Sequence, residues 1–143
     1  METIRTCISF QASAAAKTIA RLARNRLAPH GVTPIQFAIL QAVSEEEHQT
    51  AADIGAALMI DSATIVGVID RLSAMDLIAR APDLADRRIY RLSLTEQGRA
   101  ALPAMQAAMD ALNTEIDSAM GASAPDVRSS LQGLMSLQLL QKD

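Results

Sequence analysis

A compact cluster of charged side chains, Asp86-Arg87-Arg88, lies between two apolar segments of the chain. An arginine guanidinium binds well in a narrow DNA minor groove, where the negative potential is enhanced. Upstream, residues 61–72 combine a polar start with apolar side chains at helical spacing. A helix beside an arginine-tipped β-ribbon can contact the major and minor grooves of DNA together. The chemistry that these residues indicate is nucleic-acid binding.

Residue types needed for other chemistry are absent or poorly spaced. His30 and His48 lie far apart, and no carboxylates accompany them at metal-ligand spacing. The sequence has no nucleophile elbow, no glycine-rich phosphate loop and no H-E-x-x-H motif. We therefore expect no metal, no cofactor and no enzymatic activity.

The net charge of −3 does not exclude DNA binding, because the charges are segregated along the chain. Residues 5–26 contain only basic charged residues, whereas acids gather at residues 45–47 and in the C-terminal third. Phosphate contact requires a local basic face and not a basic protein. No apolar run approaches the roughly 20 residues of a membrane span, so no membrane contact is expected. A single cysteine fits a reducing cytoplasm.

Apolar spacing and capping residues predict a mainly helical fold with one small β-ribbon. Few aromatic residues and many Ala, Leu, Ile and Met residues also favour helix over sheet. Helices are expected to begin near residues 4, 33, 50, 61, 95 and 123. The acidic residues 45–47 are expected in an exposed loop, and Pro103 is expected to kink or restart the fifth helix.

Two short helices joined by a tight turn at Met59-Ile60 predict a helix-turn-helix. The second of them is capped by Asp61 or Ser62, and it carries an apolar face that leaves polar and small residues outside. This apolar face consists of Ile65, Val68, Ile69 and Leu72. Strands are predicted at residues 77–80 and 89–94, where apolar and polar residues alternate in the second strand.

These segments resemble the MarR family of bacterial transcription regulators. The matching motifs are T-P-I-Q-F-A-I-L at 33–40, V-I-D-R-L at 68–72, L-I-A-R at 77–80, P-D-L-A-D-R-R at 82–88 and L-S-L-T-E-Q-G at 92–98. The resemblance covers nearly the whole chain and implies a single domain over residues 1–143. It implies a winged helix-turn-helix over residues 33–95, flanked by dimerisation helices at 1–30 and 100–143.

The resemblance also implies a set of DNA-binding residues in three places. These are Thr33 and Gln36 near the DNA backbone, Ser62, Ala63, Thr64, Val66, Gly67 and Arg71 on the recognition helix, and Asp86, Arg87 and Arg88 in the wing. Ser62 or Thr64 could instead cap the helix, and Arg71 could pair with an acid of its own domain. Within the wing, Asp86 is expected to orient the guanidinium of Arg88.

The sequence departs from the family pattern at the recognition helix and just after it. Val66 and Gly67 stand where the family often has polar or arginine base contacts. We therefore expect modest base discrimination by this helix, with Gly67 permitting a close backbone approach and groove shape contributing more. Asp76 stands where the family usually has glycine, so a left-handed backbone with slight strain is expected there.

The implied function is transcription regulation by a homodimer that binds double-stranded DNA at a palindromic operator. The apolar terminal helices favour a dimer, because exposing them would cost about 25 cal/mol per Å². The resemblance further implies a repressor that answers to an aromatic or phenolic effector. Two alternatives stay open: a winged-helix protein-interaction module, and a redox sensor that uses Cys7. Packing is preferred for Cys7, because the family's sensing branch surrounds its cysteine with tyrosines and this chain has only Tyr90.

Overall fold

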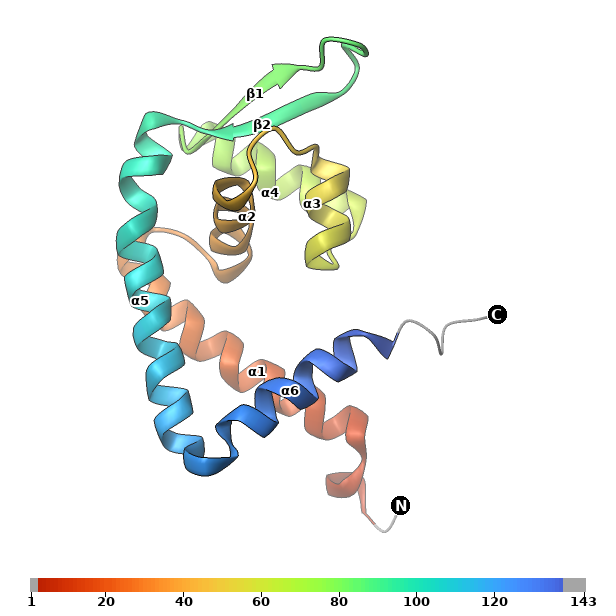
Figure 1. Ribbon diagram of the computed structural model, residues 1–143, viewed down its shortest axis with the longest axis vertical. Helices are drawn as coiled ribbons and strands as arrows, with labels where there is room; N and C mark the ends of the chain where they lie inside the picture. The colour runs from red at the N-terminus through yellow and green to blue at the C-terminus, as the bar shows by residue number, and fades with distance from the viewer. Residues whose placement is uncertain (1–2, 138–143) are drawn as a thin grey trace. The chain divides into compact units, whose positions relative to one another are not determined.

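The computed structural model describes residues 3–137, so both ends of the predicted dimerisation segments, residues 1–2 and 138–143, lie outside the described range. The helices and strands, in chain order, are α1 (Ile8–Leu27), α2 (Pro34–Glu45), α3 (Ala51–Leu58), α4 (Ser62–Ala74), β1 (Ile78–Pro82), β2 (Tyr90–Leu94), α5 (Glu96–Met120) and α6 (Ala124–Met135). This mainly helical fold with one β-ribbon confirms the predicted fold class (Figure 1). The chain divides into two compact units, Met1–Met109 and Asp110–Asp143, which are described separately.

The first helix begins later than predicted. Residues Ile4–Thr6 form a single 3-10 turn, and the extended backbone of Cys7 separates that turn from α1. The Thr6 hydroxyl donates to the Thr3 carbonyl oxygen at 2.8 Å and accepts from the Thr3 N–H at 3.4 Å. Such local side-chain bonds compete with helical bonds, which explains why the prediction of a helix from residue 4 was wrong.

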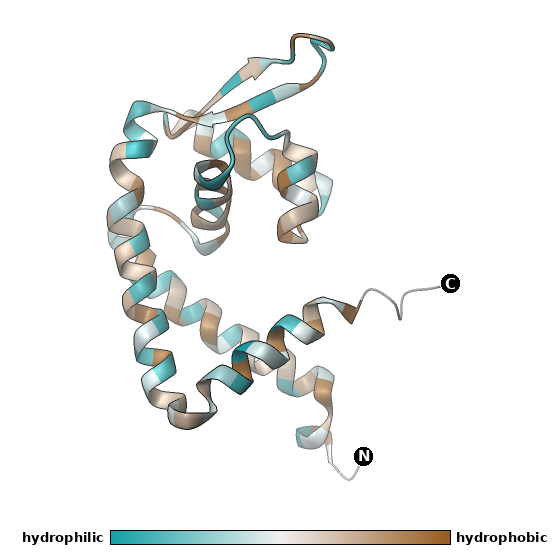
Figure 2. Cartoon of the chain, viewed as in Figure 1, coloured by the Kyte–Doolittle hydropathy of each residue, from teal (hydrophilic) through white to brown (hydrophobic). Residues whose placement is uncertain are grey.

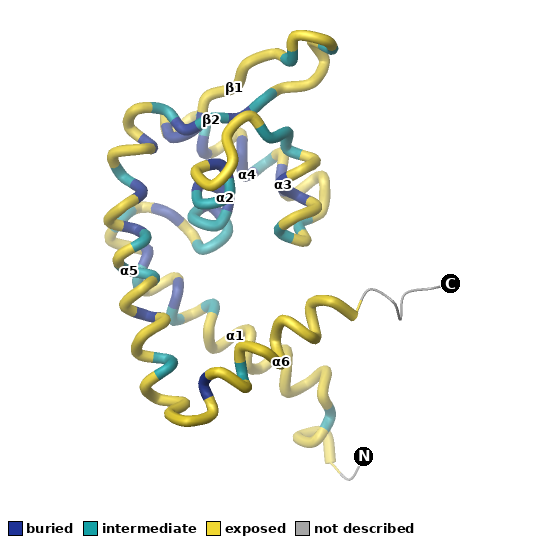
Figure 3. Tube along the Cα trace, viewed as in Figure 1, coloured by how far each residue is buried: buried dark blue, intermediate teal, exposed yellow. Residues whose placement is uncertain are grey.

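The core of the first unit lies where α2, α3, α4 and the ribbon meet, as the buried segments in Figure 3 show. All four predicted apolar residues of α4 are buried, which confirms the apolar face assigned to that helix. They pack in one cluster with buried residues of α2 and β2, including Ile39, Leu40, Leu92 and Leu94. Each fully buried Leu or Ile side chain stabilises the fold by about 1.5–3 kcal/mol, so this cluster fixes α4 against the ribbon.

A tight turn at Asp76 leads from α4 into β1. Asp76 has φ 58°, which confirms the left-handed backbone expected there. The Thr95 hydroxyl donates to the Asp76 carbonyl oxygen at 2.6 Å and accepts from the Gly98 N–H at 2.9 Å. It therefore caps α5 and ties this helix to the turn. A Cβ at Gly98 would overlap the Leu77 carbonyl oxygen, so only glycine permits this close approach.

The two strands form an antiparallel ribbon, with Ile78 opposite Leu94 and Pro82 opposite Tyr90. Each strand begins one residue later than predicted, and β1 extends to Pro82. Pro82 is tolerated because β1 is an edge strand. The second edge of β2 is paired with the α2–α3 loop, where the His48 N–H donates to the Leu92 carbonyl oxygen at 2.8 Å.

The remaining helices correct two further expectations. Pro103 was expected to kink or restart the fifth helix. Helix α5 runs without interruption through this proline, so the restart alternative was wrong. Glu45 belongs to the last turn of α2, and only the following acids lie in the exposed loop.

Apolar residues recur along both α1 and α6 (Figure 2), and several of them are exposed. The large ones are Ile8, Phe10 and Ile19 on α1 and Leu131, Leu134 and Met135 on α6. Dimerisation through these helices stays a prediction.

Within residues 3–137, no single helix is both long and apolar enough to cross a membrane. Helices α3 and α4 meet the length and composition requirements only as a pair, and this pair is bent by 117°. The apolar residues of α4 are already used in the core of the first unit.

Candidate nucleic-acid interface

The N-terminus of α4 is capped by Asp61 and not by Ser62. Asp61 Oδ1 accepts a hydrogen bond from the Thr64 N–H at 2.8 Å, and Asp61 Oδ2 accepts one from the Thr64 hydroxyl at 2.7 Å. These bonds to Thr64 lower the pKa of the Asp61 carboxyl below its ordinary value. This confirms Asp61, one of the two caps predicted for this helix, and it removes the capping alternative for Ser62 and Thr64. Ser62 stays exposed in the first turn.

One face of α4 carries the remaining predicted contact residues outside the core. Ser62, Ala63, Thr64 and Val66 are exposed, and the side chain of Val66 retains 51% of its accessible surface. A Cβ built at Gly67 would meet nothing within 4 Å, so the backbone is open to an approaching molecule there.

Arg71 lies one turn further along α4 and is exposed. Among residues 3–137, the structure records no ion pair or hydrogen bond for its side chain. The described residues therefore do not show Arg71 paired with an acid of its own domain. Its guanidinium remains available for a phosphate.

The wing tip places Asp86 and Arg88 as a bidentate pair. Asp86 Oδ1 accepts from Arg88 Nε at 3.0 Å, and Asp86 Oδ2 accepts from Arg88 Nη2 at 2.8 Å. Asp86 also accepts from the Arg88 N–H at 3.0 Å. These bonds lower the pKa of Asp86 and raise that of Arg88. The Arg88 side chain nevertheless keeps 89% of its accessible surface, against 34% for Asp86, so the guanidinium is oriented but uncovered.

A second aspartate, which the sequence analysis did not single out, holds the wing loop. Asp83 Oδ2 accepts from the Ala85 N–H at 3.0 Å and from the Asp86 N–H at 2.9 Å, while Asp83 Oδ1 accepts from Arg91 Nε at 2.8 Å. The bond from the Asp86 N–H contributes most to lowering the pKa of Asp83. Arg91 also donates to the His48 carbonyl oxygen at 3.3 Å, which links the wing to the α2–α3 loop. An aspartate followed by a turn is a recognisable local pattern, so this role had a signal in the sequence.

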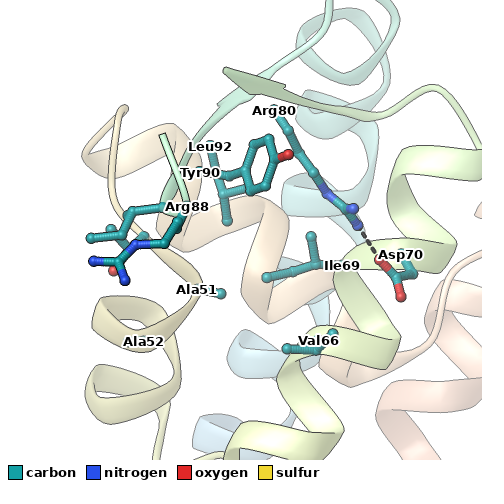
Figure 4. Close-up of a pocket in the computed structure, with 11 residues that line it drawn as sticks. Ala51, Ala52, Val66, Ile69, Asp70, Arg80, Arg88, Tyr90 and Leu92 are labelled. Atoms are coloured by element: carbon teal, nitrogen blue, oxygen red, sulfur yellow. Dashed lines mark hydrogen bonds and ion pairs between the residues drawn. The ribbon is translucent and has the colours of Figure 1, made fainter. Parts of the chain in front are cut away.

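A third charged pair joins the wing to α4. Arg80 of β1 donates to Asp70 of α4, as the dashed line in Figure 4 shows. Beside this pair, residues of α3, α4 and the ribbon line a solvent-open pocket of about 350 Å³. Its lining is mainly apolar and includes Val66, Ile69 and Tyr90. No sequence pattern indicates the pairing of Arg80 with Asp70, because only the reversal of the chain at Asp76 brings the two together.

Thr33 and Gln36 lie at the N-terminus of α2 and cap it reciprocally. The Gln36 N–H donates to the Thr33 hydroxyl at 3.3 Å, and Gln36 Oε1 accepts from the Thr33 N–H at 2.9 Å. Gln36 is buried, with 9% of its surface accessible, whereas Thr33 is exposed. Capping accounts for both residues, and their contact with a DNA backbone stays a prediction.

Cys7 precedes α1 and does not lie within its apolar stripe. The thiol is partly exposed, and its Sγ lies 3.2 Å from the Ser9 hydroxyl, whose hydrogen bond lowers the pKa of Cys7. Within residues 3–137, no group of three His, Cys, Asp or Glu side chains is arranged to hold a metal ion.

Known proteins with similar sequences and folds are transcription regulators. A sequence model of the MarR family matches residues 30–89. The chain is 31% identical over 131 residues to the HTH-type transcriptional regulator TtmR of Methylorubrum extorquens, covering 92% of this chain and 65% of the relative. It is 40% identical over 74 residues to the HTH-type transcriptional repressor NicR of Pseudomonas putida, covering 52% of this chain and 47% of the relative.

A solved structure of the transcriptional repressor CouR bound to a 23-mer DNA duplex has a similar fold, with a TM-score of 0.86 and 22% identity. This similarity covers 95% of our chain and 96% of that chain. The chain spans about two thirds or less of the curated relatives' own lengths. The family match includes α2, α3, α4, β1 and the wing loop as far as Ile89, and it ends just before β2. Over these elements, this chain is similar to the MarR family.

Proposed function

We propose that this protein is a transcription regulator that binds double-stranded DNA in a sequence-specific way. The exposed face of α4 enters the major groove, and the wing places Arg88 in the adjacent minor groove. Residues Ser62, Ala63, Thr64, Val66 and Gly67 are the proposed major-groove contacts. Arg71 and Arg87 supply phosphate contacts in this proposal.

The observation that carries the proposal is the bidentate pairing of Arg88 with Asp86 at the wing tip. A flexible arginine would lose side-chain entropy when it enters a narrow groove. Here Asp86 has already restricted the guanidinium, while leaving 89% of the Arg88 side chain accessible. An oriented and uncovered cation at the end of a rigid ribbon suits a ligand of concentrated negative charge.

The experiment compares Arg88→Ala with Arg99→Ala in DNA binding. Arg99 is also an exposed arginine with an acidic partner, Glu47, but it lies on α5 outside the proposed interface. The probe is a duplex that the wild-type protein selects from a random-sequence library. We expect Arg88→Ala to weaken binding about tenfold or more and Arg99→Ala to change it little. Equal affinity of the two variants at matched salt would contradict the role of Arg88.

The same titration separates a DNA-binding regulator from a protein-interaction module. Wild-type affinity should fall steeply as salt rises, because binding releases counterions from phosphates. The slope should become shallower by about one for each cationic contact that is removed. A winged-helix adaptor would show no salt-dependent binding to duplex DNA at all.

The protein acts in this proposal as a cytoplasmic homodimer and represses transcription from a palindromic operator. The exposed apolar residues of α1 and α6 support dimerisation, because a partner would remove them from water. A two-fold dimer presents two copies of α4 to half-sites about one turn of DNA apart. An aromatic or phenolic effector would release DNA only if it prefers the DNA-incompetent arrangement. Sedimentation measures the dimer, and displacement of bound duplex by a panel of aromatic acids and phenols tests the effector.

One observation favours a second candidate, in which the regulator senses oxidants through Cys7. The Ser9 hydroxyl lowers the pKa of the partly exposed thiol, and a thiolate reacts faster than a thiol with peroxide. Comparing operator binding by the wild type and Cys7→Ser after hydrogen peroxide treatment tests this candidate. Oxidant-dependent loss of binding in the wild type alone would support it, and equal behaviour would refute it.

A further inference from the structure

The apex of the wing presents an apolar side chain that the fold itself does not use. Leu84 is fully exposed, at 103% of its reference surface, which is more than any other large apolar residue within residues 3–137. The next most exposed large apolar residue, Ile8, reaches 64%. Leu84 lies four residues before Arg88 in the same loop. The most exposed apolar side chain of the described protein and the proposed minor-groove arginine therefore share one wing tip.

The exposure of Leu84 is built into an ordered loop. Asp83, which precedes it, accepts hydrogen bonds from the backbone N–H groups of Ala85 and Asp86, and its own N–H donates to the Ile89 carbonyl oxygen at 2.8 Å. The Ile89 N–H in turn donates to the Asp86 carbonyl oxygen at 3.0 Å. These bonds close the loop beneath Leu84. They leave the side chain in water without a packing partner.

An apolar side chain held in this position has a known use at DNA surfaces. Proteins that occupy the minor groove often insert Leu, Ile or Met between base pairs and partly unstack one step. Arginine beside such a wedge supplies the attraction that brings it to the groove. On the basis of the DNA-binding function proposed above, we infer that Leu84 is an apolar wedge that enters the minor groove beside Arg88.

A wedge of this kind adds specificity that no hydrogen bond supplies. Unstacking costs least at flexible pyrimidine–purine steps, so the wing should prefer duplexes with such a step where Leu84 enters. This preference would complement α4, whose Val66 and Gly67 offer few hydrogen-bonding groups to base edges.

The test uses the full-length protein and the duplex selected by the wild type, with Leu84→Ala, Leu84→Gln and Leu84→Met. Gln keeps the length of the side chain without its apolar character, and Met keeps both. Because Leu84 makes no contact in the fold, all three variants should keep the wild-type melting temperature. We expect Ala and Gln to weaken binding about ten- to hundred-fold, from the loss of one buried leucine, and Met to bind nearly as the wild type does.

Two further measurements separate a wedge from a charge effect. The salt dependence of binding should keep the wild-type slope in every Leu84 variant, whereas Arg88→Ala should make it shallower. With 2-aminopurine at the step where the wing binds, the wild type should raise the fluorescence by unstacking, and Leu84→Ala should not.

Each result either supports or overturns the inference. Wild-type affinity of Leu84→Ala, an altered salt slope in Leu84→Ala, or unchanged 2-aminopurine fluorescence with the wild type would overturn it. A wild type that selects no duplex would instead overturn the proposed function, and the wedge with it. The wedge would be established if affinity requires an apolar side chain at residue 84, the salt slope stays unchanged in the Leu84 variants, and the wild type unstacks the 2-aminopurine step.

Discussion

Replacing Gly67 by alanine separates the stability of α4 from its use at a DNA surface. Gly67 lies in the interior of α4, and a Cβ added there would meet nothing within 4 Å. Glycine in a helix interior costs about 0.5–1 kcal/mol relative to alanine, mainly through backbone entropy. Since no clash offsets this gain, Gly67→Ala should raise the free energy of unfolding by about 0.5–1 kcal/mol. In a protein of this size, that gain corresponds to a rise in melting temperature of about 2–4 °C.

DNA binding should change in the opposite direction. If the α4 backbone at Gly67 lies against base edges, the added methyl group must be accommodated at a closely packed surface, which costs about 1–3 kcal/mol. Affinity for the selected duplex should therefore fall about five- to hundred-fold. Ser44→Ala is the matched control, because it places a better helix former at an exposed position of α2 outside the proposed interface. A more stable Gly67→Ala protein that binds DNA as tightly as the wild type would refute the close approach.

Three other perturbations give distinct results. The hydrogen bonds from Arg88 hold the pKa of the Asp86 carboxyl below its ordinary value, so the ion pair is lost only as pH falls through this depressed pKa. Carboxyl NMR titration should show that Arg88→Ala moves the pKa of Asp86 back toward its ordinary value, while Asp83 keeps a lowered pKa. Gly98→Ala should destabilise the fold by about 1–3 kcal/mol in denaturant unfolding, because its Cβ would overlap a backbone carbonyl. Asp70→Asn removes an exposed ion pair and should cost at most about 1 kcal/mol of stability, yet it should weaken binding to duplex DNA by loosening the wing.

The apolar periodicity and the capping residues were sufficient to predict the fold, because both reflect interactions between residues close together in the sequence. The buried face of α4 was predictable from residue type and spacing, and the left-handed turn at Asp76 was implied by the family resemblance. The helix start at residue 4 failed because the hydroxyl groups of Thr3 and Thr6 compete with helical bonding, which apolar spacing does not register.

The candidate site was predictable wherever one segment supplies all its parts. The family resemblance implied that Asp86 orients Arg88, which lies two residues later in the same loop, and the structure contains this pair. The pairing of Arg80 with Asp70 joins a strand to a helix across a chain reversal, and the sequence held no sign of it. Gln36 forms a buried helix cap, a role that its place three residues after Thr33 could have suggested, and its contact with a DNA backbone stays a prediction.

The charged pairs of the wing together explain how a thin ribbon can position an arginine for DNA. Two antiparallel strands alone are marginally stable and would sample many directions. Here Arg80 fixes one strand to α4, while Arg91 fixes the other to the α2–α3 loop through the His48 carbonyl oxygen. Each exposed pair contributes little to the free energy of unfolding, but each limits the orientation of the ribbon relative to α4. Removing either arginine should therefore reduce DNA affinity more than it reduces stability.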